Sequence, residues 1–588
     1  MKQNENTTLS LMLLAALLLG FAGRANAAET AAGELLYNGI RLDPVWPPRD
    51  LDSTSRELRP VPYLQNRPAV VPIDVGRQLL VDDFLIERTT LQRVFHQPQK
   101  FAGNPVLKPE TPLELNDGIC PAAAPFSDGV FYDAKDQLFK MWYMAGWFDT
   151  AALATSKDGI TWQRPDFGVV KGTNQVVVSP EGHRRDGVSV WLDHEAAEPQ
   201  ERFKMFYYAR ARQGEKGSPP KEIGGFLLTS PDGIHWKWRG RTGSTRDNTT
   251  MFYNPFRKVW VFSHRTRSAN TEQWRVRGYW ENKDFLAGLG NWTGYKPTFW
   301  LGPDTLDTPH PAIGDATQIY KVDAVGYESL LLGLVQVHYG PHNGVAAKRG
   351  VPKLTELQVA FSRDGFHWDR SARAPFIGAT MQRGSWERGY VTSAGGVCIV
   401  VGDKLHFYYT AFEGDESRTS SMPDPTTGKN TYESWTGMYA KASTGLATLR
   451  RDGFASMDAA QSDGSLTTRP LRFQGKHLFV NVECPRGTLR VEVLDENENV
   501  IAPFSLDRSE PVSVDSTLQP MRWRGSEDLS ALAGRVVRFR FTLTAGRLFS
   551  FWVSPERTGA SHGYVAAGGP GFSGAIDDVG LPAYSPQP

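Results

Sequence analysis

The chain has 588 residues and a mass of 65.3 kDa, more than one compact core usually holds, so we expect two domains. Lys and Arg total 65 against 64 Asp and Glu, and the formal net charge of +1 excludes a partner held mainly by bulk charge, such as a nucleic acid or an anionic membrane. Aromatic residues make up 11% of the chain, beside 57 Gly and 39 Pro, which is typical of short strands and tight turns. The composition therefore predicts an all-β protein.

Residues 1–27 have the pattern of a secretory signal peptide. Lys2 precedes the apolar run LSLMLLAALLLGFAG, and the small residues Ala25-Asn26-Ala27 predict cleavage after Ala27. The run is short for a membrane span, and no second candidate follows it. We therefore expect a soluble, secreted or periplasmic mature protein without a membrane span.

The cysteines indicate no disulfide framework. Cys120, Cys398 and Cys484 are an odd number and lie far apart, so at most one bridge can form. No Cys/His spacing suggests zinc.

Residues 28–94 predict an N-terminal extension that leads into the next domain, and the part up to about residue 76 is Pro-rich and loop-like. The segment RQLLVDDFLIE, which begins at Arg77, predicts a strand at its end. We expect Asp82 and Asp83 at an exposed bend in that strand.

One phrase recurs three times, as SKDGITW at 156–162, SPDGIHW at 230–236 and SRDGFHW at 362–368. Asp-Gly between two strand-like runs predicts a hairpin, because Gly accepts positive φ and Asp binds local backbone amides. The Ser can add another such bond, and the Trp can fold back between neighbouring sheets. We interpret the phrase as a turn that recurs with a structural unit, in preference to a catalytic group.

The spacing of these turns predicts five units. Asp158 and Asp232 are 74 residues apart, whereas Asp232 and Asp364 are 132 apart, which leaves room for a hidden unit whose degenerate turn is around Asp284. A fifth turn lies around Asp452. A paired run of two strands precedes each turn, with the second strands beginning near Phe139, Phe203, Val259, Leu330 and Leu405. Units of this length built from strands predict a five-bladed β-propeller over residues 95–460.

An acidic residue stands before the first strand of each unit. The five are Asp117, Asp186, Asp247, Asp315 and Glu387. First strands of propeller blades lie innermost, so we expect all five carboxylates at one mouth of the channel, although any one of them is more often a turn former. Crowded carboxylates raise one another's pKa, and an acid beside a base is what glycosidic bond cleavage requires.

Further candidates flank these acids. Arg185, Arg246 and Arg388 can offset the repulsion or bind sugar hydroxyls and a substrate carboxylate, and the alternative is solvated charges at the rim. Trp147 and Trp386 can stack on sugar rings, and the alternative is core packing.

Residues 461–588 alternate polar and apolar positions in RPLRFQGKHLFVNVEC, TLRVEVLDENENVIAPFSL, RVVRFRFTLTA and RLFSFWVS. A period of two predicts a β-sandwich, followed by an irregular Gly/Pro-rich tail. We expect the sandwich to brace the propeller, with carbohydrate binding as the alternative.

A five-bladed propeller with one acid per blade resembles the glycoside hydrolases of families 32, 43 and 68. The pair Arg185-Asp186 resembles an Arg-Asp pair on the second blade of the fructan-cleaving members, and the appended sandwich resembles theirs. The repeated turns are similar to the sialidase Asp-box, but are one residue shorter. The resemblance covers about two thirds of the chain.

The resemblance implies roles for the acids. Asp117 would be the nucleophile or base, and Asp186 the stabiliser of the transition state. Separately from the resemblance, we expect Asp315 to bind substrate. The chain departs from the families at Asp247, where they have a Glu as proton donor, so either Asp247 or Glu387 takes that role and the stereochemical outcome stays open.

The function predicted from the sequence is cleavage of an oligo- or polysaccharide, with no required cofactor and with a structural calcium in the channel left open. A non-catalytic carbohydrate-binding or scaffold propeller is the alternative, and a lyase or phosphorylase on the same fold is a third. A sialidase is a weaker interpretation, because it needs a Tyr nucleophile besides converging Arg residues.

Overall fold

A computed structural model describes residues 33–118, 120–147, 150–211, 222–243, 245–270, 274–289, 297–420 and 436–584. Strands make up most of the regular structure in these residues, which confirms the all-β prediction. The helices are short: α2 (Pro62–Gln65), α3 (Pro112–Leu115) and α4 (Asn343–Arg349). The 3-10 turns are η1 (Asn116–Gly118), η2 (Pro199–Glu201), η3 (Leu286–Gly288), η4 (Gly437–Tyr439), η5 (Ser530–Leu532) and η6 (Leu581–Tyr584).

Five antiparallel sheets follow one another in the middle of the chain, and we number them 1 to 5. Sheet 1 has β6 (Ala123–Asp133), β7 (Leu138–Ala145), β8 (Thr150–Ser156) and β9 (Gln175–Val177). Sheet 2 has β10 (His183–Leu192), β11 (Phe203–Ala211), β12 (Glu222–Ser230) and β13 (Lys237–Arg241). Sheet 3 has β14 (Thr250–Asn254), β15 (Val259–Arg267), β16 (Arg275–Asn282) and β17 (Thr298–Leu301).

The last two sheets recruit strands from outside the repeated region. Sheet 4 has β18 (Gln318–Glu328), β19 (Leu330–Gly340), β20 (Leu354–Ser362) and, from the end of the chain, β33 (Tyr564–Val565). Sheet 5 has β21 (Gly389–Ser393), β22 (Ile399–Val401), β23 (Lys404–Phe412), β24 (Ala442–Arg450) and, from before sheet 1, β5 (Gln99–Lys100).

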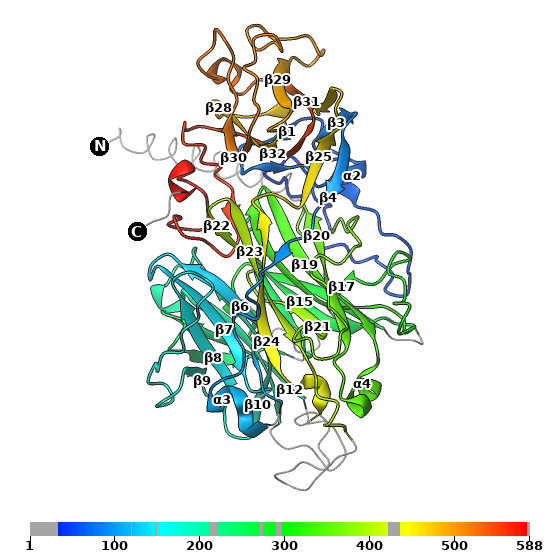
Figure 1. Ribbon diagram of the computed structural model, residues 1–588, viewed down its shortest axis with the longest axis vertical. Coiled ribbons are helices and arrows are strands. Elements are labelled where there is room, and N and C mark those ends of the chain that lie inside the picture. Colours follow the sequence, from blue (N-terminus) through cyan, green and yellow to red (C-terminus); the bar gives the residue numbers. More distant parts are fainter. Residues whose placement is uncertain are drawn as a thin grey trace, which may run out of the picture.

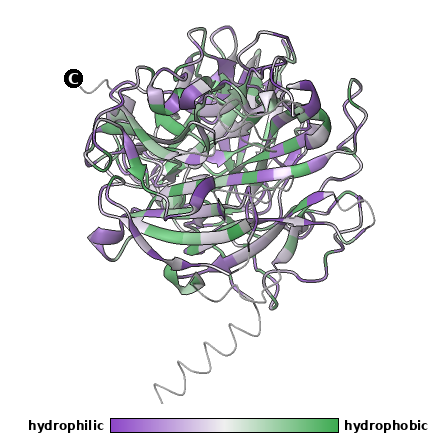
Figure 2. Cartoon of the chain, turned by 90° about the horizontal axis from the view of Figure 1, so that it is seen from below, coloured by the Kyte–Doolittle hydropathy of each residue, from purple (hydrophilic) through white to green (hydrophobic). Residues whose placement is uncertain are grey.

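The sheets form a closed ring. The first strands β6, β10, β14 and β18 contact one another in succession, and β21 contacts both β20 and β6. Because β5 completes sheet 5 before the chain enters sheet 1, the two ends of the ring are joined by strand pairing. Figure 2 views the molecule from below and shows apolar and polar residues interleaved along the strands.

Each of the three repeated turns attaches its own sheet to the one before it in the ring. In the turn after β8, the Ser156 hydroxyl accepts a hydrogen bond of 2.9 Å from the Gly159 amide. The Asp158 carboxylate accepts hydrogen bonds from the backbone amides of Ile160 and Thr161. The Gly159 carbonyl then accepts a hydrogen bond of 2.7 Å from Tyr408 in sheet 5.

The other two copies are seated in the same way. Trp142 of sheet 1 donates to the Gly233 carbonyl of sheet 2 at 2.8 Å, and Trp300 of sheet 3 donates to the Phe366 carbonyl of sheet 4 at 2.7 Å. The phrase therefore recurs because its turn is the contact by which one sheet recognises its neighbour.

The remaining strands form a β-sandwich above the ring (Figure 1). One sheet has β4 (Gln92–Phe95), β25 (Ala455–Ala459), β32 (Gly546–Ser554), β28 (His477–Glu483) and β30 (Asp515–Pro520), with β2 (Gln78–Leu79) on β32. The other has β3 (Ile86–Thr89), β26 (Gly464–Thr468), β31 (Arg538–Thr544) and β29 (Thr488–Leu494). A short parallel pair joins β1 (Val71–Pro72) to β27 (Leu471–Arg472). The rings of Phe541 and Phe551, 5.3 Å apart, join the two main sheets.

Residues 33–94 differ from the expected extension into the propeller, because they are part of the sandwich. Leu80, Phe84 and Leu85 are fully buried in the same core as the C-terminal strands. The strands of this segment have only two to four residues, too few to show a period in the sequence. Figure 1 shows blue β3 and β4 among the orange and yellow strands of the other end of the chain.

Of the two acids expected at an exposed bend, only Asp83 is exposed. Asp82 is buried and forms a two-pronged ion pair with Arg363 of sheet 4, at 2.7 and 2.9 Å. Asp83 is exposed and contacts Arg93. Asp82 therefore ties the sandwich to the ring.

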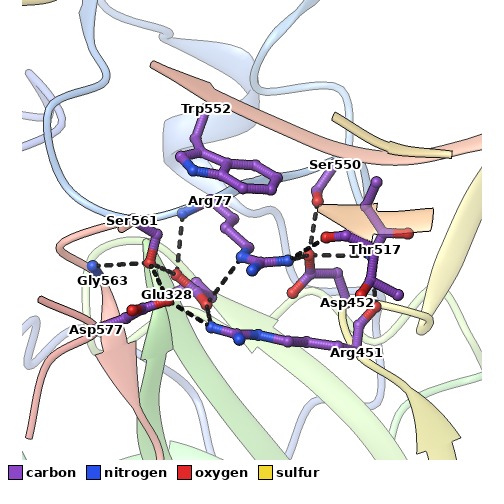
Figure 3. A network of polar contacts seen from close by, with 12 residues as sticks. Arg77, Glu328, Arg451, Asp452, Thr517, Ser550, Trp552, Ser561, Gly563 and Asp577 are labelled. Carbon is purple, nitrogen blue, oxygen red and sulfur yellow. Dashed lines mark hydrogen bonds and ion pairs between the residues drawn. The ribbon is translucent and has the colours of Figure 1, made fainter. Parts of the chain in front are cut away.

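A buried charge network joins ring, sandwich and C-terminal tail (Figure 3). Arg77 contacts Glu328 of sheet 4 and Asp452 beyond sheet 5. Arg451 contacts Glu328 at 2.9 Å and Asp577 of the tail at 2.8 Å. The two arginines and their three carboxylate partners have no exposed side-chain surface, so the network fixes the two domains against each other.

The three cysteines are free and buried. Within the described part of the chain, no helix has the length and apolar character needed to cross a membrane. The predicted signal peptide and its cleavage site lie outside the described residues.

Candidate functional site

The channel mouth away from the sandwich holds two of the predicted acids together. Asp186 lies at a bulge in β10, and Asp247 precedes β14, so the two come from neighbouring sheets. The Arg210 guanidinium at the end of β11 lies between them, with Nε 2.5 Å from Asp186 and Nη2 3.3 Å from Asp247. Arg265 of β15 also contacts Asp247. Figure 1 shows this end of the ring at the bottom, near α3 and α4.

A tyrosine and a lysine lie behind these acids. Lys353, which is 1% exposed, donates a hydrogen bond of 2.8 Å to the Tyr320 hydroxyl. Its ammonium also faces the rings of Tyr390, at 4.1 Å, and Tyr439, at 5.4 Å. Burial raises the pKa of Tyr390 well above its ordinary value, and Tyr320 and Tyr439 raise it further. Asp186 makes a smaller contribution to the pKa of Tyr390 in the same direction. The acids and the lysine therefore belong to one neighbourhood.

Trp147 packs among the buried aromatic residues beside this group and is not exposed to a ligand. It is buried, stacks on Tyr439 at 4.3 Å and meets Phe126 edge-on at 5.2 Å. Its ring thus packs in the core, which was the alternative to sugar stacking.

Glu387 does not join Asp186 and Asp247. Its carboxylate accepts a hydrogen bond of 2.9 Å from Tyr409 of β23 and lies 2.9 Å from the Lys100 ammonium of β5. Tyr409 is on the second strand of sheet 5 and Lys100 on its outermost strand, so Glu387 points along its own sheet. Trp386 is half-buried beside Tyr409.

Asp117 and Asp315 do not join the other acids. Asp117 is exposed in η1 with a φ of 51°, and no contact joins it to the other acids in the described part of the chain. Asp315 accepts the backbone amide of His342 at 3.0 Å and so holds the turn after β19. The expectation that five carboxylates share one well is therefore reduced to the pair Asp186 and Asp247.

The predicted arginines have three different surroundings. Arg185 is fully buried and binds Asp128 of β6 through two hydrogen bonds of 2.6 and 2.7 Å. Arg246 is exposed, and Arg388 contacts Glu416 at 2.7 Å. Arg185 thus joins sheets 1 and 2 and does not face a ligand.

The middle of the ring is filled by a lysine. The Lys321 ammonium lies 2.8 Å from Asp323 and donates to the carbonyl oxygens of Phe126 and Ser393. Among the described residues, no group of three or more His, Cys, Asp or Glu side chains could hold a metal ion.

A cavity of about 510 Å³ opens beside the Lys353 segment. Its walls include Asp315, His342, Arg349 and Arg388. This volume is in the range of small-molecule sites.

Sequence reasoning missed Arg210, Tyr320 and Lys353. Arg210 ends the otherwise apolar strand FKMFYYARA, and this charge was an available signal. Tyr320 and Lys353 carry no such signal, because their proximity depends on how β18 and the segment before β20 pack.

No protein-family model matches the chain, and no curated protein matches it by sequence. Several solved structures are similar. An N-acetylgalactosamine deacetylase from F. plautii is 15% identical over 59% of this chain and 97% of its own, with a TM-score of 0.37. A thermostable family-43 glycoside hydrolase is 10% identical over 56% of this chain and 92% of its own, with a TM-score of 0.35. A fructofuranosidase from Schwanniomyces occidentalis is 10% identical over 81% and 98%, with a TM-score of 0.34. Likenesses of this size assign no activity to the chain.

Proposed function

We propose that the protein is a glycoside hydrolase-like enzyme that cleaves an oligo- or polysaccharide at the channel mouth. The observation that carries the proposal is the bridge that Arg210 forms between Asp186 and Asp247. Two carboxylates brought close together from neighbouring sheets are the groups that glycosidic bond hydrolysis uses. The cavity of about 510 Å³ at Lys353 combines apolar walls with the charged side chains of Asp315, Arg349 and Arg388, and its volume suits a ligand of sugar size.

The two acids take different roles in this proposal. The Asp247 side chain is 16% exposed and that of Asp186 is 5% exposed. Asp247 therefore meets the substrate as base or nucleophile, and Asp186 stabilises positive charge that develops at the anomeric carbon. Arg210 keeps the two carboxylates apart and oriented.

The test is hydrolysis of an oligosaccharide panel by the wild-type protein and by Asp247→Asn. We expect the variant to lose activity by a factor of about 10² to 10⁴. Glu387→Gln is the matched control, because that carboxylate faces sheet 5, and it should retain wild-type activity. Full activity in Asp247→Asn would refute the assignment.

A specific observation favours a second function, carbohydrate binding without cleavage. Both acids already contact guanidinium groups, which favours their ionised forms and leaves neither as an evident proton donor. In that case calorimetry would detect a sugar that binds the wild type, binds Asp247→Asn more weakly and is released unchanged.

We also propose that the protein is exported, on the support of the apolar run and the Ala25-Asn26-Ala27 pattern. Expression of the full chain in a bacterium, followed by N-terminal sequencing of the periplasmic fraction, tests this. The expected first residue is Ala28, and an intact Met1 on protein confined to the cytoplasm would contradict it.

A further inference from the structure

Three buried cations at the channel mouth lack a carboxylate partner. Arg275, Arg277 and Lys353 are 7%, 0% and 1% exposed. Within the described part of the chain, the hydrogen bonds of Arg275 go to Gln318, those of Arg277 to backbone carbonyls and Ser263, and that of Lys353 to Tyr320. Buried charges are costly unless an opposite charge compensates them, so this neighbourhood requires an anion.

All three cations converge on Tyr320. Lys353 donates to its hydroxyl at 2.8 Å, the Arg275 guanidinium lies 5.1 Å from its ring centre, and Arg277 donates to its backbone carbonyl at 2.8 Å. A phenol that receives a hydrogen bond from an ammonium group can supply the missing negative charge itself by ionising.

The other groups around Tyr320 also favour its ionised form. Arg265 of β15 adds positive charge, and His338 of β19 stacks on the Tyr320 ring with its centre 5.1 Å away. Burial, with Arg275 second, holds the pKa of His338 well below its ordinary value, so that imidazole is neutral. Tyr390 of β21 and Tyr439 of η4 present ring faces to Lys353. No carboxylate contacts Tyr320 among the described residues.

The balance of these effects lowers the pKa of Tyr320. Burial raises it, but Lys353, followed by Arg275, outweighs burial and brings the pKa down to about 7. The pKa of Lys353 is lowered by its own burial, while Tyr320 opposes that shift.

We infer that Tyr320 ionises near neutral pH to a phenolate paired with Lys353, and that it is the proton acceptor of the channel mouth, with Asp247 as the nucleophile. The second half of this inference rests on the proposed function, whereas the first half does not. The phenolate oxygen forms a new O–H bond with a proton from the attacking water or a substrate hydroxyl. The O–H bond of the donor breaks, and its electron pair stays on the donor oxygen. Lys353 lies in the wall of the cavity of about 510 Å³, and the buried Tyr320 lies directly behind Lys353.

Ultraviolet absorbance at 295 nm of the intact protein between pH 5.5 and 9 tests the ionisation. The chain has 19 Tyr, and an ordinary phenol titrates near pH 10, so a change equal to one tyrosinate near pH 7 is the expected result. Tyr320→Phe should abolish this transition, and Lys353→Met should move it above pH 9. Tyr253→Phe is the control and should keep the transition near pH 7, because the Tyr253 hydroxyl binds Glu195 away from the channel mouth.

The inference would be overturned by a wild-type protein without a transition below pH 9, or by a transition that survives in Tyr320→Phe. A bound anion would then have to compensate the three cations.

With a substrate from the panel, Tyr320→Phe should lower kcat/KM at pH 8 at least a hundredfold and remove the limb of the pH profile near pH 7. An intact transition with full activity in Tyr320→Phe would refute the proton-accepting role alone. Loss of activity in Tyr320→Phe but not in Asp247→Asn would refute the role proposed for Asp247 and support the role proposed for Tyr320.

Discussion

Arg185 holds Asp128 through two parallel hydrogen bonds of 2.6 and 2.7 Å, and so joins the first strands of two neighbouring sheets deep inside the ring. Burial raises the pKa of Asp128, while Arg185 opposes that effect. The pair belongs to the scaffold, although Arg185 resembles a member of a known active-site pair in sequence.

Replacing Arg185 by Met should destabilise the protein by about 3 to 5 kcal/mol, because the buried Asp128 carboxylate would lose its partner. Denaturant unfolding followed by tryptophan fluorescence measures this. Arg388→Met is the control, since its partner Glu416 is at the surface and the change should be small. Equal stability of the two variants would show that the pair does not support the ring.

Gly233 should not tolerate a side chain. It has a φ of 80°, and a Cβ atom there would overlap the Trp142 ring. Gly233→Ala should therefore cost the strain of the left-handed backbone, about 1 to 2 kcal/mol, plus about 1 to 3 kcal/mol for overpacking.

Gly314→Ala separates these two effects. Gly314 has nearly the same φ, 81°, and no atom lies within 4 Å of the place that a Cβ atom would take, so only the backbone strain should appear. Thermal unfolding of both variants should give the larger loss for Gly233→Ala, and a similar loss in both would mean that the contact with Trp142 is unimportant.

Glu328→Gln should weaken the attachment of the sandwich to the ring. The Glu328 carboxylate contacts Arg77 and Arg451 and accepts a hydrogen bond of 2.7 Å from Ser561. Its removal leaves two buried guanidinium groups with fewer counter-charges, at a cost of about 3 to 5 kcal/mol. Calorimetry should show a lower melting temperature, with the sandwich and ring beginning to unfold separately.

The matched control for this change is Glu498→Gln, which breaks the surface pair with Arg88. Its melting curve should match that of the wild type. A single unshifted transition in Glu328→Gln would count against the network as the link between the domains.

Acid should destabilise the protein between pH 6.5 and 4. Burial, with Lys404 second, lowers the pKa of His406 to about 4, and burial also lowers that of His338. The unfolded chain binds protons at these groups below pH 6.5 and the folded chain does not, so stability falls as pH falls through this window. The urea midpoint at pH 7 and pH 5 measures the loss. His406→Gln should make it smaller, and an unchanged pH dependence would refute the assignment.

Local sequence patterns predict most of the turns and strands of the ring. The Ser-x-Asp-Gly turns form the hydrogen bonds that their residues predict, because a turn is decided by neighbours within a few residues. The strands predicted near Phe139 and Leu330 are β7 and β19, since each is a long apolar run. By contrast, the short strands of the N-terminal segment, of two to four residues, are decided by distant partners.

The candidate site was predictable only in part. Asp186 and Asp247 lie at the starts of first strands, as their positions predict, but Glu387 starts a strand too and points along its own sheet. The direction of a side chain at such a position depends on bulges and turns that spacing does not encode. The register of β10 and β11, which places Arg210 opposite Arg184 and next to the bulge at Asp186, is likewise absent from the sequence pattern.

The amino-acid sequence alone determined that the chain is all-β, that a strand unit repeats through its middle, and that a second set of strands follows, because periodicity and turn residues act over short distances. Tertiary structure alone decided which acids meet, that Lys353 reaches Tyr320, and that the N-terminal segment completes the sandwich. These contacts join residues far apart in the chain, and they form only once closure of the ring brings its sheets together.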